Sequence, residues 1–365
     1  MKDRCHVVAL VMLVAALLPG SSAGQEVRVV SGADTSIAGL LPPSGDAPLP
    51  RTPWGAPDLA GIWNNSTQIP FERLTEEEQA RSNAAQEAVR EATGGTGAGW
   101  LEQATGRERP SLIVDPPDGR IPPLRPEAIE RLVAREQARV GRGEGDSWLD
   151  RNSWERCISR TLPIAMIPNI YNANYQILQT EDHVAIVLEM IHETRIIPLD
   201  GRAHVAEGIR QWLGDSRGRW EGDTLVVETE LFHNRLDGGD YQPSHIIQTT
   251  HRGPGDTLRL VEQFHLIDAN RIDYQFTVED PNTYTRPFTV AIPMTRRDTS
   301  DPLNHLFEYA CHEGNYGMVN LLTGARADEE LALEAAALVS RQRIDAGHPG
   351  IREPAVPIVD AEVPR

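Results

Sequence analysis

Lysine is almost missing from this chain. Of its 365 residues only Lys2 is a lysine, and every other basic side chain is arginine or histidine. Schiff-base catalysis and pyridoxal-phosphate chemistry both need an internal lysine, so both are excluded. The sequence also lacks a glycine-rich phosphate loop, and neither nucleotide binding nor a serine-hydrolase nucleophile elbow is expected. We therefore expect no cofactor.

Long apolar runs are scarce as well. The segment Val7–Leu18 follows the basic residues Lys2 and Arg4 and precedes the small residues Ser21-Ser22-Ala23. It is shorter than the roughly 20 residues that span a bilayer, and this order of basic, apolar and small residues is typical of a secretory signal. Residues 1–23 are thus expected to be a signal peptide that is cleaved from a periplasmic or extracellular protein. The alternative is an uncleaved anchor.

Cysteine is also rare, and two cysteines remain after the expected cleavage, Cys157 and Cys311. An oxidising compartment favours a disulfide between them. The loop that it closes is long, and the chain-entropy model then predicts about 5 kcal/mol of stabilisation. Two separate buried thiols are the alternative.

Basic residues are outnumbered, because the chain has 53 acidic and 35 basic residues and a formal net charge of −18. The electric field of a negative net charge repels phosphate backbones and anionic lipids. Neither nucleic acid nor a membrane surface is therefore expected as a partner. The expected partner is a small-molecule ligand or substrate, and the oligomeric state is left open.

The chain divides into a signal, a flexible linker, a helical and proline-rich strap region, a β domain with a closing helix, and a loose tail. Their expected bounds are residues 1–23, 24–50, 51–150, 151–345 and 346–365. Helices are predicted near residues 75–92, 126–140 and 327–343. The last has Leu331, Ala335 and Leu338 as its apolar stripe. The strap VDPPDGRIPPL is too rich in proline for regular structure.

Apolar residues recur with a period of two from about Asn174 onward, which indicates strands. Strands are predicted at residues 175–180, 183–192, 194–199, 224–230, 245–252, 257–267, 271–279, 288–294 and 306–309. Short turns join most of them. The fold class is therefore mainly β, an antiparallel barrel or sandwich of about eight strands, with N-terminal helices and one C-terminal helix.

One carboxylate falls on an apolar face of this sheet. Alternation places Glu262 in one row with Leu258, Leu260, Phe264 and Leu266. A buried carboxylate must be paired, hydrogen-bonded or protonated. The functional interpretation is an acid or base whose pKa is raised by an apolar cavity. The structural alternative is an arginine partner that holds the barrel closed.

Two histidines join Glu262 as candidates for acid–base chemistry. His192 ends the inward row of residues 183–192, at the expected barrel mouth, and His312 lies in the loop CHEGNY. A structural histidine is the alternative at the first position. Neighbouring residues on a strand point to opposite faces, so His192 and Glu193 are not expected to share an ion. No H-x-H or HExxH motif is present, and no metal site is expected.

Three polar loops, RQWLGDSRGRWE, EDPNTYTR and CHEGNY, concentrate tryptophan, arginine and acidic residues. Such loops can hold a small polar ligand, or they can simply be fixed by ion pairs. The expected substrate-binding residues are Trp212, Asp215, Arg217, Trp220, Arg286 and Tyr316.

Several of these segments, among them CISRTLP, IRQWLGDSRGRWEGDTLVVET and FEYACHEGNYG, resemble a large group of exported bacterial proteins of unassigned function. The resemblance covers Trp54 to Arg326. It implies export and this architecture, and it brings no reaction and no functional residue. The β-rich half is also similar, at the level of fold alone, to lipocalin-like barrels that hold small amphipathic molecules.

Two functions are consistent with these patterns. The first is an enzyme of isomerase, lyase or hydrolase type, with His192 and Glu262 as the proton-moving pair and Arg217 or Arg286 holding anionic charge. The alternative is a non-catalytic periplasmic carrier. The enzyme requires His192, Glu262 and His312 to lie in one pocket.

Overall fold

The computed structural model describes residues 48–92, 105–106, 109–138, 140–143, 145–169, 172–233 and 257–345. The expected signal peptide, most of the expected linker, the strand predicted at 245–252 and the expected tail lie outside these residues. Within these residues the chain forms three α-helices: α1 (Glu76–Ala92), α2 (Pro126–Ala138) and α3 (Tyr316–Asp345). In the described part of the chain, no helix is long and apolar enough to cross a membrane.

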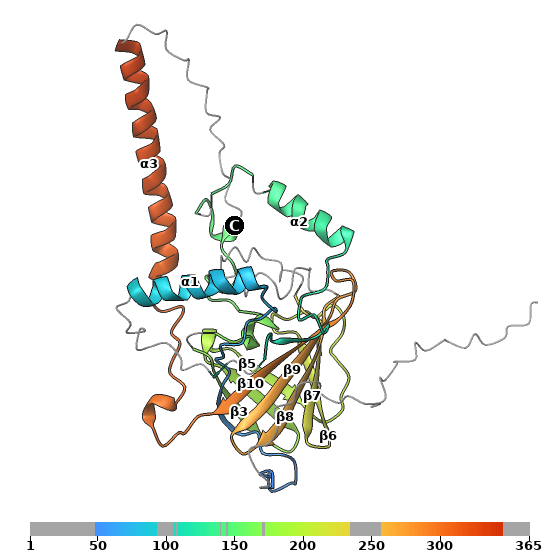
Figure 1. Cartoon of the computed structure of the whole chain (residues 1–365). Coiled ribbons are helices and arrows are strands. Elements are labelled where there is room, and N and C mark those ends of the chain that lie inside the picture. The colour runs from blue at the N-terminus through green and yellow to red at the C-terminus, as the bar shows by residue number, and fades with distance from the viewer. Residues whose placement is uncertain are drawn as a thin grey trace, which may run out of the picture. The chain divides into compact units, whose positions relative to one another are not determined.

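Ten strands of the described chain form one sheet, and all of their pairings are antiparallel. The strands are β1 (Gly61–Asn64), β2 (Ile113–Asp115), β3 (Asn174–Gln179), β4 (His183–Leu188), β5 (Thr194–Pro198), β6 (Asp215–Glu221), β7 (Thr224–Glu230), β8 (Arg259–Asp268), β9 (Arg271–Glu279) and β10 (Phe288–Arg296). Their order is β5-β4-β3-β1-β10-β9-β8-β7-β6, and β2 pairs with β10. The sheet curls into a nearly closed barrel, which confirms the predicted fold class (Figure 1).

The first strand of the chain joins the two halves of this sheet. β1 pairs on one side with β3, where Ile62 lies opposite Gln176, and on the other side with β10, where Trp63 lies opposite Arg296. Residues 51–150 therefore contribute a central strand in addition to the expected strap. Within that strap, Ile113–Asp115 also forms regular structure as β2, because its backbone meets the open edge of β10 ahead of the prolines.

The predicted inward rows are confirmed on the long strands. In β8 the side chains of Leu260, Glu262, Phe264 and Leu266 are all fully buried. In β9 the same holds for Ile272, Tyr274, Phe276 and Val278, which are at most 1% exposed. These rows meet Trp63 and the inner faces of β4 and β10 in one core.

Other sequence predictions need correction. Residues 306–309 form no strand, and Phe307 is 53% exposed. The segment expected to be a loop, Arg210–Glu221, contains β6, because Asp215 to Glu221 pair along their length with β7. The turn between these strands is Gly222-Asp223, where Gly222 has a φ of 58°, a conformation that glycine tolerates.

The strand predicted at 183–192 also ends early. It stops at Leu188, and residues Met190–His192 form a single helical turn in which Ile191 and His192 both have positive φ. This turn carries His192 out of the inward row, and its side chain is exposed.

The predicted disulfide between Cys157 and Cys311 is present, with Cα atoms 5.7 Å apart. It fixes the chain just ahead of α3. The helix itself begins at Tyr316, well before the predicted start near residue 327. The side chain of Asn315 caps the beginning of α3 by accepting a hydrogen bond from Met318 N.

Candidate functional site

The charged group inside the barrel is an ion pair that crosses its interior. Arg195 on β5 donates two hydrogen bonds to the Glu262 carboxylate on β8, at 2.9 and 2.5 Å. The Tyr274 hydroxyl donates a third at 2.8 Å, and Thr229 lies at 3.4 Å. Both charged side chains are at most 1% exposed. Glu262 points inward as predicted, and its partners correspond to the structural alternative, an arginine that holds the barrel closed.

Burial and charge keep the protons of Arg195 and Tyr274 in place beside Glu262. Burial and the neighbouring Glu262 carboxylate together raise the pKa of Tyr274 well above its usual range, so the phenol remains a donor. Burial alone would lower the pKa of Arg195, but the attraction of Glu262 raises it instead. Since the base, the acid and the donor are locked to one another, this group is suited to holding strands together rather than to exchanging protons.

The two ends of the sheet meet at a seam between β5 and β6, which are not hydrogen-bonded neighbours in the strand order. At Gly218 the strands approach closely, because an added Cβ would lie 2.8 Å from Ile197 Cγ2. Towards the start of both strands the seam opens into a cavity of about 520 Å³. Its lining is Glu193, Thr194, Arg195, Ile196 and the segment from Arg210 to Ser216. We call this space the seam cavity.

Glu193 is a carboxyl group on one wall of the seam cavity. It follows the turn at His192 and precedes β5. The Ser159 hydroxyl donates a hydrogen bond to it at 2.7 Å. Burial raises the pKa of Glu193, and the hydrogen bonds from Ser159 and from the backbone of Arg160 offset only part of that effect. Glu193 is therefore a carboxyl group that holds its proton more tightly than usual.

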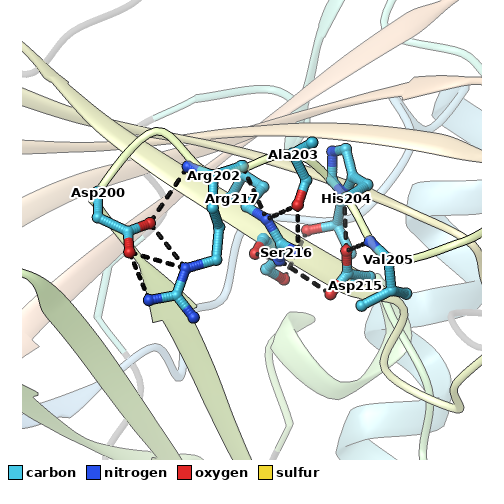
Figure 2. A network of polar contacts seen from close by, with 9 residues as sticks. Asp200, Arg202, Ala203, His204, Val205, Asp215, Ser216 and Arg217 are labelled. Carbon is cyan, nitrogen blue, oxygen red and sulfur yellow. Dashed lines mark hydrogen bonds and ion pairs between the residues drawn. The ribbon is translucent and has the colours of Figure 1, made fainter.

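Asp215, at the start of β6, is the carboxyl group on the opposite strand. His204 Nδ1 lies 2.8 Å from one of its oxygens, and the Val205 amide donates to that oxygen at 3.1 Å. Arg217 donates to the other oxygen at 2.9 Å and also holds the carbonyl of Ala203 (Figure 2). Burial alone would raise the pKa of Asp215, but these three partners outweigh it and lower the pKa.

Two further features give the seam cavity binding capacity. Trp212 stacks on His233 with ring centroids 4.7 Å apart and an interplanar angle of 8°. Arg210 is anchored by a hydrogen bond to the carbonyl of Phe232 at 3.2 Å. The lining of the cavity thus combines a flat aromatic ring with the guanidinium of Arg210, which can donate to an acceptor group.

The sequence-predicted site residues are only partly brought together. Trp212 and Asp215 line the seam cavity, and Arg217 holds Asp215. Trp220 packs against the core further along β6, Arg286 pairs with Asp115 at 2.7 Å, and Tyr316 is 73% exposed at the start of α3. His192 and His312 are both exposed. Neither histidine is among the partners of the buried Glu262, so these three side chains do not form the expected constellation.

Glu193, Ser159 and His204 were not predicted as site residues. The available signal was the dipeptide His192-Glu193, since a turn that exposes the histidine brings the glutamate towards the adjoining strand. Gly214-Asp215-Ser216-Arg217-Gly218 also matches the spacing G-x-S-x-G. It opens a strand of a hairpin instead of joining a strand to a helix. Ser216 is buried and bonds to Thr229 at 2.9 Å, so the nucleophile-elbow interpretation fails.

Within the described residues, no group of three histidine, cysteine or carboxylate side chains is placed to hold a metal ion. Comparison with family models, with curated proteins and with solved structures gave no significant match for this chain. The functional argument therefore depends on the geometry of the seam cavity.

Proposed function

We propose that this chain is an enzyme that moves a proton on a small organic molecule held in the seam cavity, in a reaction of isomerase, lyase or hydrolase type. One observation carries the proposal. Two carboxyl groups, Glu193 and Asp215, line the same cavity, and their surroundings move their pKa values in opposite directions. In such a pair Glu193 holds a proton more tightly than a free carboxyl group and Asp215 less tightly, which is the separation that an acid and a base in one site require.

The remaining side chains divide into positioning and binding roles. Ser159 orients the Glu193 carboxyl through its 2.7 Å hydrogen bond. Asp215 keeps its charge through Arg217 and His204, and it can stabilise positive charge that develops on the substrate. Trp212 offers its ring to a planar part of the substrate, and Arg210 offers a donor to an acceptor atom. The volume of about 520 Å³ is in the usual range for small-molecule sites.

A carrier is the second candidate. The stacked Trp212 and the guanidinium of Arg210 favour it, because both can contribute to binding without requiring turnover. A carrier would retain its ligand chemically unchanged, whereas the enzyme would convert it.

One experiment separates the two functions. The purified protein is mixed with a metabolite extract, and retained compounds are identified by mass spectrometry. Each retained compound is then incubated with wild type, with Glu193→Gln and with the control Glu221→Gln, whose side chain is 53% exposed and paired with Arg219. The enzyme predicts conversion by wild type and control, and binding without conversion by Glu193→Gln. Binding without conversion by all three indicates a carrier. Equal retention by Trp212→Ala would exclude the seam cavity as the site.

Export is proposed together with this function. The Cys157–Cys311 disulfide supports an oxidising compartment, in agreement with the signal-like order of residues 1–23. Sequencing of the protein recovered from a bacterial periplasm should give an N-terminus near Gly24. A chain that still begins with the apolar segment Val7–Leu18 would contradict export by cleavage.

A further inference from the structure

The seam between β5 and β6 follows from the direction of these two strands. The described sheet runs from β5 to β6 through strands whose neighbours are all antiparallel, and nine strands lie on this path, so the two end strands run in the same direction. A barrel of antiparallel strands closes without a parallel pair only when the number of strands is even. One further strand, antiparallel to both β5 and β6, would therefore complete the alternation at the seam.

The edge of β5 that faces the seam carries free backbone groups. The carbonyl of Glu193 accepts a hydrogen bond from Leu188 N at 2.8 Å, so the backbone of Glu193 is directed towards β4. Bonded residues alternate in an antiparallel ladder, so Arg195 also bonds to β4, while the N–H and C=O groups of Thr194 and Ile196 point to the seam. Among the described residues these four groups have no hydrogen-bond partner.

These free groups lie at the wide end of the seam. Thr194 and Ile196 both line the seam cavity, and Ile196 is 56% exposed. Pro198, two residues further on, occupies the same side of the strand but has no N–H to donate. Beyond Ile196 the seam narrows, because Gly218 approaches β5 closely. The open edge is therefore the stretch from Thr194 to Ile196, a length of about 7 Å.

The opposite wall of the cavity offers fewer free groups. The two-residue turn Gly222-Asp223 joins β6 to β7, and the alternation counted back from this turn directs the backbone of Ser216 towards the seam. The carbonyl of Ser216 already accepts a hydrogen bond from Arg217 at 2.7 Å. A ligand that pairs with backbone groups at the seam therefore pairs chiefly with β5.

We propose that the molecule held in the seam cavity is a short peptide in extended conformation, which adds to the free edge of β5 as an antiparallel strand. Its first and third residues exchange four hydrogen bonds with the backbones of Thr194 and Ile196. Its second residue lies opposite Arg195, so that side chain points to the interior side of the sheet.

The spacing of the free groups favours a peptide over other small molecules. A donor and an acceptor that recur at every second residue, about 7 Å apart, are a property of an extended peptide backbone. Strand addition is also an established mode of peptide recognition, in which the main chain supplies affinity. Because it names the class of ligand in the seam cavity, the inference rests on the proposed function, although it concerns binding alone.

Modified peptides test the proposal on the full-length chain. A library of acetylated and amidated tripeptides is screened for retention, and the affinity of the best binder is measured by isothermal titration calorimetry. N-methylation of its third residue removes a donor to β5 and should weaken binding at least about tenfold. N-methylation of its second residue is the matched control, because that N–H points away from β5, and it should change the affinity less than about threefold.

A proline on the edge of β5 tests the same contact from the protein. Ile196→Pro removes a free N–H without breaking the bonds between β4 and β5, and Pro198 shows that the strand accepts proline on this side. This variant should bind the unmodified tripeptide at least about tenfold more weakly. Ile196→Val keeps the N–H and should bind like wild type. Circular dichroism checks that both variants fold, and the N-methylated peptides decide the question on wild type if Ile196→Pro does not.

The outcomes separate this inference from the proposed reaction. A library without a binder would overturn the peptide, as would equal effects of the two N-methyl groups or unchanged binding by a folded Ile196→Pro. A dimer that Ile196→Pro dissociates, seen in sedimentation velocity, would assign the edge to a second copy instead. Conversion of a compound without peptide bonds would overturn the peptide and leave the proposed reaction in place. A tripeptide that binds at this edge and stays unconverted would support the peptide and favour the carrier over the enzyme.

Discussion

Glu262 is fully buried and Glu193 is half-buried, and their surroundings prepare the two carboxyl groups for different tasks. Glu262, inside the barrel, accepts hydrogen bonds from Arg195 and Tyr274 and has a charge partner in direct contact. Glu193, at the seam, accepts from Ser159 and from a backbone amide, and no arginine pairs with it among the described residues. Burial with a full charge partner produces a structural tie, whereas burial with hydrogen bonds alone produces a group that can hold and release a proton.

The strongest test of this contrast removes the charge of the structural carboxylate. Glu262→Gln leaves the buried Arg195 without its counter-charge, and we expect a loss of about 3–5 kcal/mol in the free energy of unfolding. Urea denaturation measures it. The control is Glu279→Gln on the neighbouring strand, where the carboxylate is 37% exposed and paired with Arg259, and where less than about 1 kcal/mol should be lost. Equal losses in the two variants would remove the distinction between the interior and the surface.

Removal of the disulfide tests whether the seam is stabilised by the Cys157–Cys311 bond, independently of the Arg195–Glu262 ion pair. Cys157 lies two residues before Ser159, the partner of Glu193, so Cys157→Ser with Cys311→Ser loosens that wall of the seam cavity. We expect a loss of about 3 kcal/mol in the free energy of unfolding, less than the roughly 5 kcal/mol of the chain-entropy model, because residual structure in the unfolded chain reduces the entropic effect. Wild type with a reductant should behave like the double variant. Because Glu262 shares no partner with this bond, the cost of Glu262→Gln should be the same in both backgrounds. A strongly reduced cost would show that the two regions are coupled.

Alternation in the sequence was enough to find the buried position of Glu262, because β8 is long and its apolar row is regular. The same rule places Arg195 in one row with Ile197, so the sequence alone indicates two inward-facing side chains of opposite charge. The sequence does not indicate that these two side chains contact each other, because the contact depends on the closure of the sheet that brings β5 across from β8.

Prediction from the sequence was wrong where the backbone geometry departs from the two-residue period of a strand. Positive φ at Ile191 and His192 turns the chain, exposes the histidine and places Glu193 at the seam. No residue in this turn is a glycine or asparagine that would have signalled such a conformation. β1 is only four residues long, and its strand character comes from partners more than 100 residues away, which no local pattern records.

A smaller effect is expected from the third member of the interior group. Tyr274→Phe removes the donor that lies 2.8 Å from Glu262 and keeps the ring that packs on Phe264 at 4.7 Å. A hydrogen bond to a charged group contributes about 2 kcal/mol, and we expect that loss in urea denaturation. Tyr316→Phe, at an exposed position, should change nothing measurable. An unchanged free energy of unfolding in Tyr274→Phe would mean that Arg195 alone satisfies the Glu262 carboxylate.

The smallest effects are expected at the seam, and there the sign is informative. The pKa of Glu193 is raised on folding, so its contribution to stability is full below the unfolded-state pKa and is lost as the pH rises through the folded-state pKa. Glu193→Gln carries no charge and should gain stability relative to wild type over that window.

The pKa of Asp215 is lowered, so its contribution is present above the unfolded-state pKa and is lost as the pH falls through the folded-state pKa. Asp215→Asn should therefore be less stable than wild type at neutral pH, and the difference should vanish in acid. Both differences should stay below about 1 kcal/mol, because solvent screens the seam. Urea denaturation at a series of pH values should show two difference curves of opposite sign, and curves parallel to that of wild type would mean that neither carboxyl group has the environment assigned to it.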